Sequence, residues 1–437
     1  MKTVGVAIIG FGTVGSGVAK LLLEDADRLG AATGCRPVLK YVCDIDLARP
    51  RNVAVPRELL TSDLDRVIAD KDVAVAVETV GGTTFAVDLM KRLLAAGKDV
   101  VTANKAALAE RGPELFAAAR QAGRSISFEA SVAAGIPILR AIRDGLLANR
   151  ISEVVGILNG TCNYILTRMS QTGASYDQAL REAQAKGYAE ADPHLDVSGE
   201  DSRHKLAILG GLAFGADVSL RDVYVEGIAG IDPIDITYGA RLGYVLKLLG
   251  IARCENGALS LRVHPTFVPA SNLLANVSDA FNAVLVRGHA VGDTFYYGRG
   301  AGQMPTASSI VADVIDAAMG RARMTFGNMA WLAGRGVALA TKPIQELETR
   351  YYLRFDVLDK PGVLASLAGI LGKNEISVAS LLQQESSQPQ SVPLVITTHL
   401  AREGSVAAAL DEIRGLSCVT GQVVRIRMLE SGEETVA

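Results

Sequence analysis

Two lysines and the carboxylates near them are the residues of this chain best suited to chemistry. Lys105 comes shortly after Val100–Thr102, a run that favours a short strand. Ligands of open α/β sheets bind at the carboxyl ends of strands, so Lys105 is well placed for catalysis. Asp201 and Lys205 are four residues apart and share one face if a helix runs through Ser202–Phe214. The alternative interpretations are a solvated lysine at a turn, and a capping aspartate with an ion pair.

A glycine-rich loop near the N-terminus is suited to binding phosphates. Its sequence is Gly10-Phe11-Gly12-Thr13-Val14-Gly15. The loop follows a strand expected at Val4–Ile9 and opens a helix expected at Val14–Leu23. Gly10 permits a tight turn, Gly12 lets the backbone approach a pyrophosphate, and Gly15 allows the helix to pack closely on the strand. We therefore expect a dinucleotide at the helix N-terminus, with a glycine turn that binds nothing as the alternative.

The residues after the second expected strand bear on the choice between NAD and NADP. Asp44 or Asp46 could accept hydrogen bonds from the ribose hydroxyls of NAD. Arg49 and Arg51 stand close by, and an arginine at this place can hold the 2′-phosphate of NADP. The pattern favours NAD and leaves NADP open, and Asp46 can equally be an ordinary turn residue.

Composition bounds the class of protein. The chain has 437 residues, which predicts two to four domains, and its 49% apolar and 21% charged residues are typical of soluble proteins. No run of 18 apolar residues and no cleaved leader is found, so we expect neither a membrane partner nor export. Five scattered cysteines fit the reducing cytoplasm. A net charge of −3 without a basic stripe argues against nucleic acid and favours small-molecule partners.

The first part of the chain alternates short β-branched runs with helical patterns. The expected strands are Val4–Ile9, Val38–Asp44, Val73–Thr79, Val100–Thr102 and Ser125–Phe128. Helical spacing covers Val14–Leu23 and Thr84–Ala96, and Gly97 stands where a C-cap glycine is expected. Such alternation is typical of βαβ units. We therefore predict an α/β, Rossmann-like doubly wound domain over residues 1–130, which a helix at about 305–320 rejoins.

Residues 131–304 mix helical and strand patterns, which predicts a central mixed α/β domain. Helices are expected at Ile138–Leu147, Tyr164–Met169, Gln178–Lys186, Ser202–Phe214 and Arg241–Leu249. Strands are expected at Val154–Leu158, Ala283–Gly288 and Thr294–Tyr297. Asn256-Gly257 between apolar runs predicts a hairpin.

The end of the chain predicts a small separate domain. Residues 321–349 lose clear periodicity and gain glycines, so we interpret them as a linker. The elements expected after it are the strand Tyr351–Val357, the helix Val363–Leu371, the strands Ser377–Leu382 and Leu394–Thr398, the helix Val406–Ile413 and the strand Val419–Met428. That order predicts a ferredoxin-like domain over residues 350–430.

Seven short motifs occur in the order found in homoserine dehydrogenases, and residues 4 to about 320 resemble that family. The motifs are Gly10–Gly15, Thr102–Lys105, Phe128–Val132, Asn159–Thr161, Gly187–Pro193, Asp201–Lys205 and Gly298–Gly302. The resemblance implies that the central domain is catalytic and dimerises. It also implies reversible, NAD(P)-dependent interconversion of L-homoserine and L-aspartate 4-semialdehyde, in the synthesis of threonine, methionine and isoleucine.

The resemblance implies roles for single residues. Lys205 would be the proton donor and acceptor, and Lys105 a second catalytic lysine. The residues implied to hold homoserine are Glu190, Asp196, Asp201, Gly160 and Thr161. Those implied to contact the cofactor are Gly10, Phe11, Gly12, Thr13, Val14, Gly15, Asp44, Thr102, Lys105 and Gly302. A lysine acts as a base at neutral pH only if burial or a neighbouring cation lowers its pKa, as two lysines in one cleft can do, whereas its ammonium donates without such a shift.

The segment 128–136 resembles the loop that binds a monovalent cation, Na⁺ or K⁺, in that family. Glu129 and the carbonyl groups of Val132, Ala134 and Ile136 would be the ligands. Ala134 stands where the family usually has glycine, and Gln303 stands where it commonly has glutamate. The alternative interpretation of Glu129 is a carboxylate at the end of a strand.

The C-terminal domain resembles the ACT domains that bind amino acids. The ligand-binding residues implied by this resemblance are Asp359, Gly362, Val363 and Gln383. L-Threonine is the implied effector, and a homodimer or homotetramer is the implied assembly. The alternative is a dimerisation module that binds no ligand, since folds of this kind serve many purposes.

Two other functions fit parts of the sequence. A dehydrogenase for another amino acid would share the glycine loop but not the block from Glu190 to Lys205. An amino-acid-responsive binding protein could keep the dinucleotide fold, yet it would have no need for both Lys105 and Lys205.

Overall fold

The N-terminal part of the chain is a doubly wound α/β domain, as predicted. The computed structural model describes residues 1–383 and 391–430. Six parallel strands lie in the order β3-β2-β1-β4-β5-β6. They are β1 (Lys2–Ile9), β2 (Cys35–Cys43), β3 (Leu60–Thr61), β4 (Val73–Glu78), β5 (Asp99–Thr102) and β6 (Ile126–Ser127). The strand order reverses between β1 and β4, and ligands of such sheets bind at that point.

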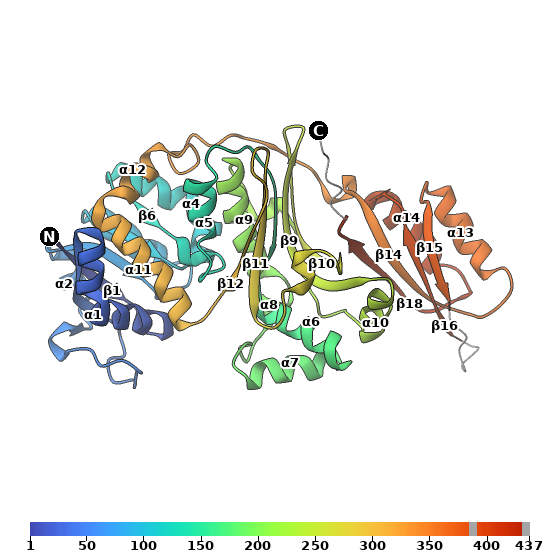
Figure 1. Ribbon diagram of the computed structural model, residues 1–437, viewed down its shortest axis with the longest axis horizontal. Coiled ribbons are helices and arrows are strands. Elements are labelled where there is room, and N and C mark those ends of the chain that lie inside the picture. The colour runs from blue at the N-terminus through green and yellow to red at the C-terminus, as the bar shows by residue number, and fades with distance from the viewer. Residues whose placement is uncertain (384–390, 431–437) are drawn as a thin grey trace.

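Helices cover both faces of this sheet (Figure 1). They are α1 (Thr13–Thr33), α2 (Leu64–Ala69), α3 (Phe85–Ala95), α4 (Lys105–Gln121) and α11 (Gln303–Met319). α11 comes from far along the chain and packs beside α1, where Ile310 and Val314 join the core formed by Val6, Ile8 and Val18. The helix expected near residues 305–320 therefore completes the N-terminal sandwich.

The central part is a second sheet with helices on one side. Its strands are β7 (Ile151–Ile157), β9 (Tyr244–Glu255), β10 (Ala258–Pro269), β11 (Phe281–Gly288) and β12 (Gly292–Arg299), in the order β12-β11-β7-β9-β10. The helices are α6 (Gly160–Thr172), α7 (Tyr176–Ala185), α8 (His194–Val197), α9 (Glu200–Phe214) and α10 (Pro233–Arg241). The expected hairpin joins β9 to β10, with Asn256 and Gly257 both at positive φ.

Two helix predictions in the central part are corrected by the structure: one segment is a strand, and one helix is shorter than expected. The helix expected at Arg241–Leu249 is instead the start of β9, because both faces of this strand are buried and its apolar run resembles a buried helix. The true helix is α10, which Asp232 caps and which ends before Gly243 at φ +84°. The helix expected at Ile138–Leu147 is one turn, α5 (Ile138–Arg140), followed by a π-helical turn.

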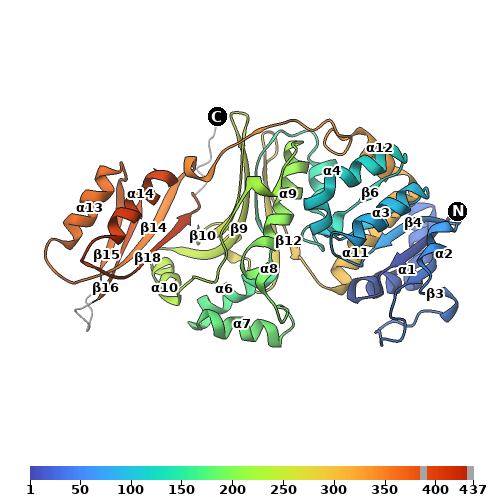
Figure 2. The same ribbon diagram turned by 180° about the vertical axis from the view of Figure 1, so that it is seen from behind.

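The C-terminal part has the predicted β-α-β-β-α-β order. It comprises β14 (Glu348–Val357), α13 (Val363–Lys373), β15 (Val378–Gln383), β16 (Val392–Thr398), α14 (Glu403–Arg414) and β18 (Val419–Met428), with the short β17 (Ala401–Arg402) before α14. Its strand order is β18-β14-β16-β15, and β18 also pairs in parallel with β10 through Thr266 and Phe267. The central and C-terminal sheets are therefore continuous, as the view from behind shows (Figure 2).

The segment 321–349 contains more structure than a linker needs. It includes α12 (Arg321–Asn328) and β13 (Ala340–Thr341), which pairs with β10. The ring of Trp331 lies 5.3 Å from that of Phe116 in α4, in an edge-to-face contact. The first half of this segment is thus attached to the N-terminal domain.

Two features bear on the environment of the chain. All five cysteines are unpaired thiols. Among residues 1–383 and 391–430, no helix is both long and apolar enough to cross a membrane.

Candidate active site

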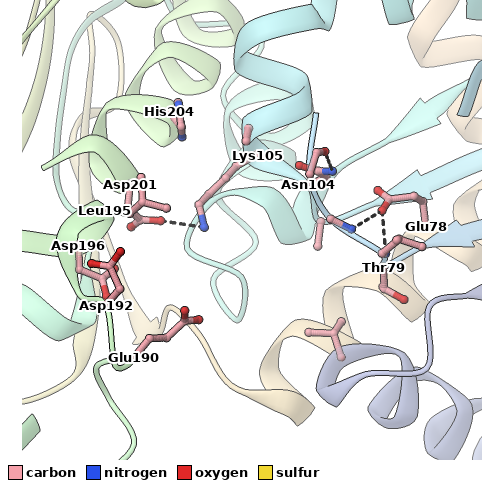
Figure 3. A pocket seen from close by; sticks show the side chains of 16 residues that line it. Glu78, Thr79, Asn104, Lys105, Glu190, Asp192, Leu195, Asp196, Asp201 and His204 are labelled. Atoms are coloured by element: carbon pink, nitrogen blue, oxygen red, sulfur yellow. Dashed lines mark hydrogen bonds and ion pairs between the residues drawn. The ribbon is translucent and has the colours of Figure 1, made fainter. Parts of the chain in front are cut away.

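A cleft of about 400 Å³ lies where the carboxyl ends of β4 and β5 face α8 and α9. Glu78, Thr79, Asn104 and Lys105 line its N-terminal side. Residues from the central part line the other side, and they are Glu190, Asp192, Leu195, Asp196, Asp201 and His204 (Figure 3). The cleft is therefore lined by two parts of the chain that are far apart in sequence.

Asp201 is the residue that joins the two lysines. Its Oδ1 lies 2.8 Å from Nζ of Lys105 and its Oδ2 lies 2.7 Å from Nζ of Lys205. Lys205 also donates to the carbonyl oxygen of Leu158 at 2.7 Å, at the end of β7. Burial alone would raise the pKa of Asp201, but the two ammonium groups hold it well below its ordinary range. The carboxylate is therefore ionised and fixes both lysines.

Asp201 also decides the charge state of Lys105. Two lysines in one cleft can lower each other's pKa, which a lysine needs to act as a base at neutral pH. The pKa of Lys105 is instead raised, first by the charge of Asp201 and against the opposing effect of burial. Lys105 is therefore held as an ammonium. This state suits proton donation and charge stabilisation rather than proton abstraction.

Asn159 organises the acidic side of the cleft, and the sequence analysis gave it no role of its own. Its side-chain nitrogen donates to Asp196 at 2.7 Å and to Asp201 at 2.8 Å. Its side-chain oxygen accepts the N–H of Cys162 and so caps α6. An asparagine between a strand and a helix is a recognisable N-cap, but its bonds to residues far along the chain leave no local pattern.

The other residues expected to hold homoserine lie around this asparagine. Burial raises the pKa of Asp196 above its ordinary range, with Asn159 opposing and Asp201 adding to the rise. Gly160 and Thr161 form the first turn of α6, and Thr161 donates its hydroxyl proton to the carbonyl oxygen of Tyr188 at 2.6 Å. Glu190 is exposed at the mouth of the cleft.

The glycine loop fits a dinucleotide. Gly10 has a φ of +99°, which side chains rarely adopt. A Cβ on Gly15 would lie 2.0 Å from the carbonyl oxygen of Gly10, so only glycine lets α1 approach β1 this closely. Gly12 directly precedes α1 and has no side chain to cap it, and apart from its chain neighbours no atom of the described residues lies within 4 Å of where its Cβ would be. The N-terminus of α1 is therefore open to a pyrophosphate.

The loop after β2 holds Asp44 and Arg51 against the glycine loop. Oδ2 of Asp44 accepts the N–H of Phe11, and its Oδ1 accepts the N–H of Asp46 at 2.8 Å. Arg51 donates to the carbonyl oxygen of Phe11 at 2.9 Å and lies 4.9 Å from the centre of its ring. Arg49 is exposed. The arginine nearest to the glycine loop is thus Arg51.

Glu78 is a second residue of the cleft that the sequence analysis did not single out. It is fully buried at the end of β4 and accepts the hydroxyl proton of Thr102 at 2.6 Å. It also accepts the N–H groups of Val80 and Gly81, which shapes the turn after β4. An acidic residue that ends a buried strand was the available indication.

The segment 128–137 and the residues 299–302 are the two connections that lead across to the central part. The N–H of Ala134 donates to the carbonyl oxygen of Gly300 at 3.0 Å, so the two connections lie side by side. The expected contact residue Gly302 has a φ of +120° and starts α11. Gln303 then donates to the hydroxyl of Ser16 in α1 at 3.0 Å, which gives its side chain a structural role.

The four residues expected to bind a cation lie on this first connection. Both carboxylate oxygens of Glu129 accept backbone N–H groups at 2.9 Å, from Leu139 and Arg140. The carbonyl oxygen of Ala134 accepts the hydroxyl proton of Ser309, and that of Ile136 accepts the N–H of Ile138. The loop also includes Val132. Within residues 1–383 and 391–430, no group of three or more His, Cys, Asp or Glu side chains is arranged to hold a metal ion.

The residues expected to bind an effector surround the start of α13 and the end of β15. Asp359 and Gly362 are exposed in the loop before α13, where Gly362 has a φ of +92°. Val363 is the first residue of α13 and Gln383 the last of β15. Gln384, which follows Gln383 in the sequence, lies outside the described residues.

Comparison with known proteins identifies the family. The model of the homoserine dehydrogenase NAD-binding domain matches residues 10–129, and the homoserine dehydrogenase model matches residues 137–315. A homoserine dehydrogenase of Pseudomonas aeruginosa is 43% identical over 436 residues, which cover 98% of this chain and 99% of that protein. The chain belongs to the homoserine dehydrogenase family. A member from Neisseria gonorrhoeae is 41% identical over 431 residues, with the same coverage of 98% and 99%.

Solved homoserine dehydrogenases share this fold over all or part of the chain. The crystal structure of one from Thiobacillus denitrificans has a TM-score of 0.91 and 40% identity, and covers 98% of this chain and 99% of that one. A hyperthermophilic archaeal homoserine dehydrogenase in complex with NADPH has a TM-score of 0.61 and 25% identity, over 73% of this chain and 98% of that one. The ACT domain model matches residues 351–418. The expected homoserine dehydrogenase with a nicotinamide dinucleotide cofactor and a C-terminal ACT domain is confirmed.

Proposed function

We propose that Lys205 is the acid and base of homoserine dehydrogenation and that Lys105 assists it. In the reducing direction, the bound nicotinamide supplies a hydride to the aldehyde carbon of L-aspartate 4-semialdehyde. The Lys205 ammonium donates its proton to the oxygen that becomes the homoserine hydroxyl, and Lys105 stabilises the negative charge on that oxygen. The observation that carries the proposal is the pair of contacts from Asp201, 2.8 Å to Lys105 and 2.7 Å to Lys205.

We assign the remaining polar groups to the amino-acid part of the substrate. Asp196, Asp201 and Glu190 are suited to its ammonium, because they supply negative charge on one side of the cleft. Gly160 and Thr161 are suited to its carboxylate, since the first amides of α6 carry partial positive charge. The two charges of homoserine would thus be held apart, with its hydroxyl directed to the lysines.

The test follows NADH and NADPH formation with purified protein, L-homoserine and each oxidised cofactor in turn. L-Serine, which lacks one methylene, is the control substrate. We expect turnover with L-homoserine alone, since the lysines sit at a fixed distance from the acidic groups. Equal rates with both amino acids would contradict the substrate assignment.

The same assay tests cofactor choice. We propose that NAD is favoured because Asp44 is held next to the glycine loop by Phe11. Arg51 is the residue suited to a 2′-phosphate, and the archaeal relative is in complex with NADPH. An Arg51→Ala variant should lose turnover with NADP more than with NAD. An equal loss with both cofactors would mean that Arg51 only supports the loop.

We also propose that a monovalent cation, Na⁺ or K⁺, binds at Glu129 and the carbonyl groups of Val132, Ala134 and Ile136. Burial and the charge of Asp313 raise the pKa of Glu129 to about 8, so a nearby cation would favour its ionised form. The hydrogen bonds noted above leave each carbonyl oxygen a second lone pair. Activity in NaCl or KCl should exceed that in choline chloride at equal ionic strength, and no difference would argue against the site.

The ACT domain is proposed to bind L-threonine as a feedback effector at Asp359, Gly362, Val363 and Gln383. The exposed loop before α13 and the match to ACT domains support this proposal. Calorimetry with L-threonine should give heat of binding, and L-threonine should lower the initial rate. Absence of binding would leave the domain as a dimerisation module.

We propose a homodimer or homotetramer. β12 and β15 are the two ends of the continuous sheet, and Leu364 and Leu381 are exposed near the second of them. Such edges and apolar side chains favour pairing with a second copy. Light scattering on purified protein should give a mass at least twice that of one chain.

We divide the chain into residues 1–130 with 305–320, residues 131–304, a connection over 321–349 and residues 350–430. The matched ranges 10–129 and 351–418 support the first and last divisions, the packing of α11 beside α1 supports placing 305–320 with the N-terminal domain, and the contact of Trp331 with Phe116 supports placing the start of the connection there too. Limited proteolysis should cut first within 335–343. The free cysteines support a cytoplasmic location.

A further inference from the structure

Lys247 is a buried lysine that the reaction does not use. It lies on β9 and is 2% exposed. Its ammonium donates to Oδ1 of Asn163 at 3.1 Å and to the carbonyl oxygen of Val277. Burial lowers its pKa to about 8, with Asp279 opposing. An ammonium held by two uncharged oxygens far from water is costly, so its presence calls for a reason.

Asn163, the partner of Lys247, ties α6 to the segment before β11. Its side-chain nitrogen donates to the carbonyl oxygens of Val277, Asp279 and Phe281, at distances of 2.9 to 3.2 Å. The hydroxyl of Thr167, one turn further along α6, accepts the N–H of Asp279 at 3.2 Å. Asp279 has a φ of +56°, a strained conformation that these bonds hold in place.

The segment 277–281 is in turn packed against the first residue of α6. A Cβ on Gly160 would lie 2.7 Å from the carbonyl oxygen of Ala280, so the backbone of this segment touches Gly160 directly. Gly160 stands between Asn159, which holds Asp196 and Asp201, and Thr161. The segment therefore limits where the start of α6 can lie relative to Asn159 and the acidic side of the cleft.

We propose that Lys247 is a positioning residue for substrate binding, because its ammonium clamps α6 and the segment 277–281 together and so fixes Gly160 and Thr161 at the cleft. The proposal rests on the assignment of these two residues to homoserine. Lys247 touches neither the substrate nor the cofactor, and it acts through Asn163 and the backbone. Its removal should weaken the binding of the amino acid and leave that of the dinucleotide unchanged.

The chain offers a matched control. Lys98 is also 2% exposed, and its ammonium also bonds to two carbonyl oxygens, those of Asp70 and Val73. It lies at the amino end of β5, at the edge of the sheet away from the cleft. Lys98→Met and Lys247→Met thus remove the same kind of interaction, one far from the substrate and one behind it.

The experiment measures KM for L-homoserine, KM for the dinucleotide, kcat and Tm for the two variants and the wild type. We expect both variants to lower Tm. Lys247→Met should raise KM for L-homoserine by about tenfold and change KM for the dinucleotide less than twofold, because a displaced binding group weakens one ligand only. Lys98→Met should change both KM values less than twofold. Lys247→Arg, which keeps the charge, should restore most of the affinity for L-homoserine.

Two results would overturn the proposal: a KM for L-homoserine that Lys247→Met leaves within twofold of the wild type, or a rise that Lys98→Met reproduces. If Lys247→Met does not fold, Asn163→Ala breaks the same clamp from the other side and must raise the same KM. Thr161→Pro separates this inference from the assignment on which it rests, because it removes one of the amide N–H groups assigned to the substrate carboxylate in the first turn of α6, where a helix tolerates proline. If Thr161→Pro leaves KM for L-homoserine unchanged, the assignment fails; if it raises KM while Lys247→Met does not, only the role of Lys247 fails.

Discussion

The central part of this homoserine dehydrogenase meets its two neighbours in different ways. On the N-terminal side, Lys105 contacts Asp201 in the wall of a cleft of about 400 Å³, and the Lys105 side chain is 39% exposed. On the C-terminal side, β18 continues the sheet at β10. The first junction leaves room for ligands, whereas the second is closed by backbone hydrogen bonds.

Buried ion pairs reinforce the second junction. Arg354 in β14 contacts Asp235 in α10 at 2.6 Å, and both side chains are at most 3% exposed. Arg427 in β18 contacts Glu403 in α14 and, at 2.9 Å, Glu226 of the central part. Charges that are removed from water in this way hold their partners in one geometry. We infer that this junction moves as one body, and that motion is concentrated at the cleft.

The contrast also suggests how the ACT domain reaches the cleft. Ile228 lies two residues after Glu226, and its N–H donates to the carbonyl oxygen of Val197 at 2.9 Å. Val197 follows Asp196, one of the residues assigned to the substrate. We propose that a displacement of Arg427 would shift Asp196, because Glu226, Ile228 and Val197 connect the two residues.

The largest expected effect lies in the cleft. Lys205→Ala should lower kcat by roughly a thousandfold, because the proton donor is lost. Dinucleotide binding, measured by fluorescence titration, should be retained, since the glycine loop is untouched. Lys98→Ala, which removes a buried lysine elsewhere, is the control. Lost dinucleotide binding in Lys205→Ala would mean that the residue is structural.

Substitutions at the second junction should lower the stability of the fold rather than the rate of the reaction. Asp235→Ala leaves the Arg354 guanidinium buried without its main partner, so we expect a loss of about 3–5 kcal/mol in the free energy of unfolding by urea. Lys105→Met breaks the ion pair with Asp201 and should leave the urea concentration at the midpoint of unfolding almost unchanged, because the Lys105 side chain is partly exposed to water. Equal losses in the two variants would remove the distinction between the junctions.

A smaller effect is expected where the second junction meets the substrate side. Glu226→Gln should keep the initial rate without effector and reduce the extent to which L-threonine, as proposed, lowers that rate. Glu226 and Asp411 both line a cavity of about 240 Å³. Asp411→Asn is therefore the matched control, since Asp411 forms an ion pair only with Arg414 among the described residues. A threonine effect that survives Glu226→Gln at full size would exclude this route.

The connection that crosses the first junction should affect how stability depends on pH. In choline chloride, where no Na⁺ or K⁺ binds, the pKa of Glu129 is about 8 in the folded chain against an ordinary 4.5, so the folded state binds a proton that the unfolded state releases. The free energy of unfolding should therefore fall as pH rises from about 4.5 to about 8. Glu129→Gln should flatten this fall in a series of Tm values, and Glu58→Gln, at an exposed site, should not. An unchanged slope would mean that Glu129 is ionised throughout.

The sequence predicts the outer two domains better than the central one. Their strands alternate with helices at regular spacing, so the pattern of each element agrees with its neighbours. In β9 the run from Tyr244 to Ile251 is apolar except for Lys247, and periodicity cannot separate a buried strand from a helix there. The helix α12 was not predicted, because few of its residues are buried and its sequence therefore lacks a clear apolar face.

In the candidate site, contacts within one helix were predictable from the sequence, whereas contacts between distant elements were not. Asp201 and Lys205 were predicted to meet because one helix carries both. The contact of Asp201 with Lys105 depends on how two domains pack, which no local spacing encodes. Asn159 and Glu78 were missed because their importance lies in bonds to distant residues.

The parallel pairing of β10 with β18 has a consequence for how this chain can be shortened. β14 supplies Tyr352, whose ring lies 5.0 Å from that of Phe267 in β10. A protein cut before residue 348 would expose Phe267 and leave that stretch of β10 without its neighbour, and bare strands of this kind invite aggregation. The ACT domain is thus not a detachable accessory, and a deletion intended only to abolish regulation would also cost solubility.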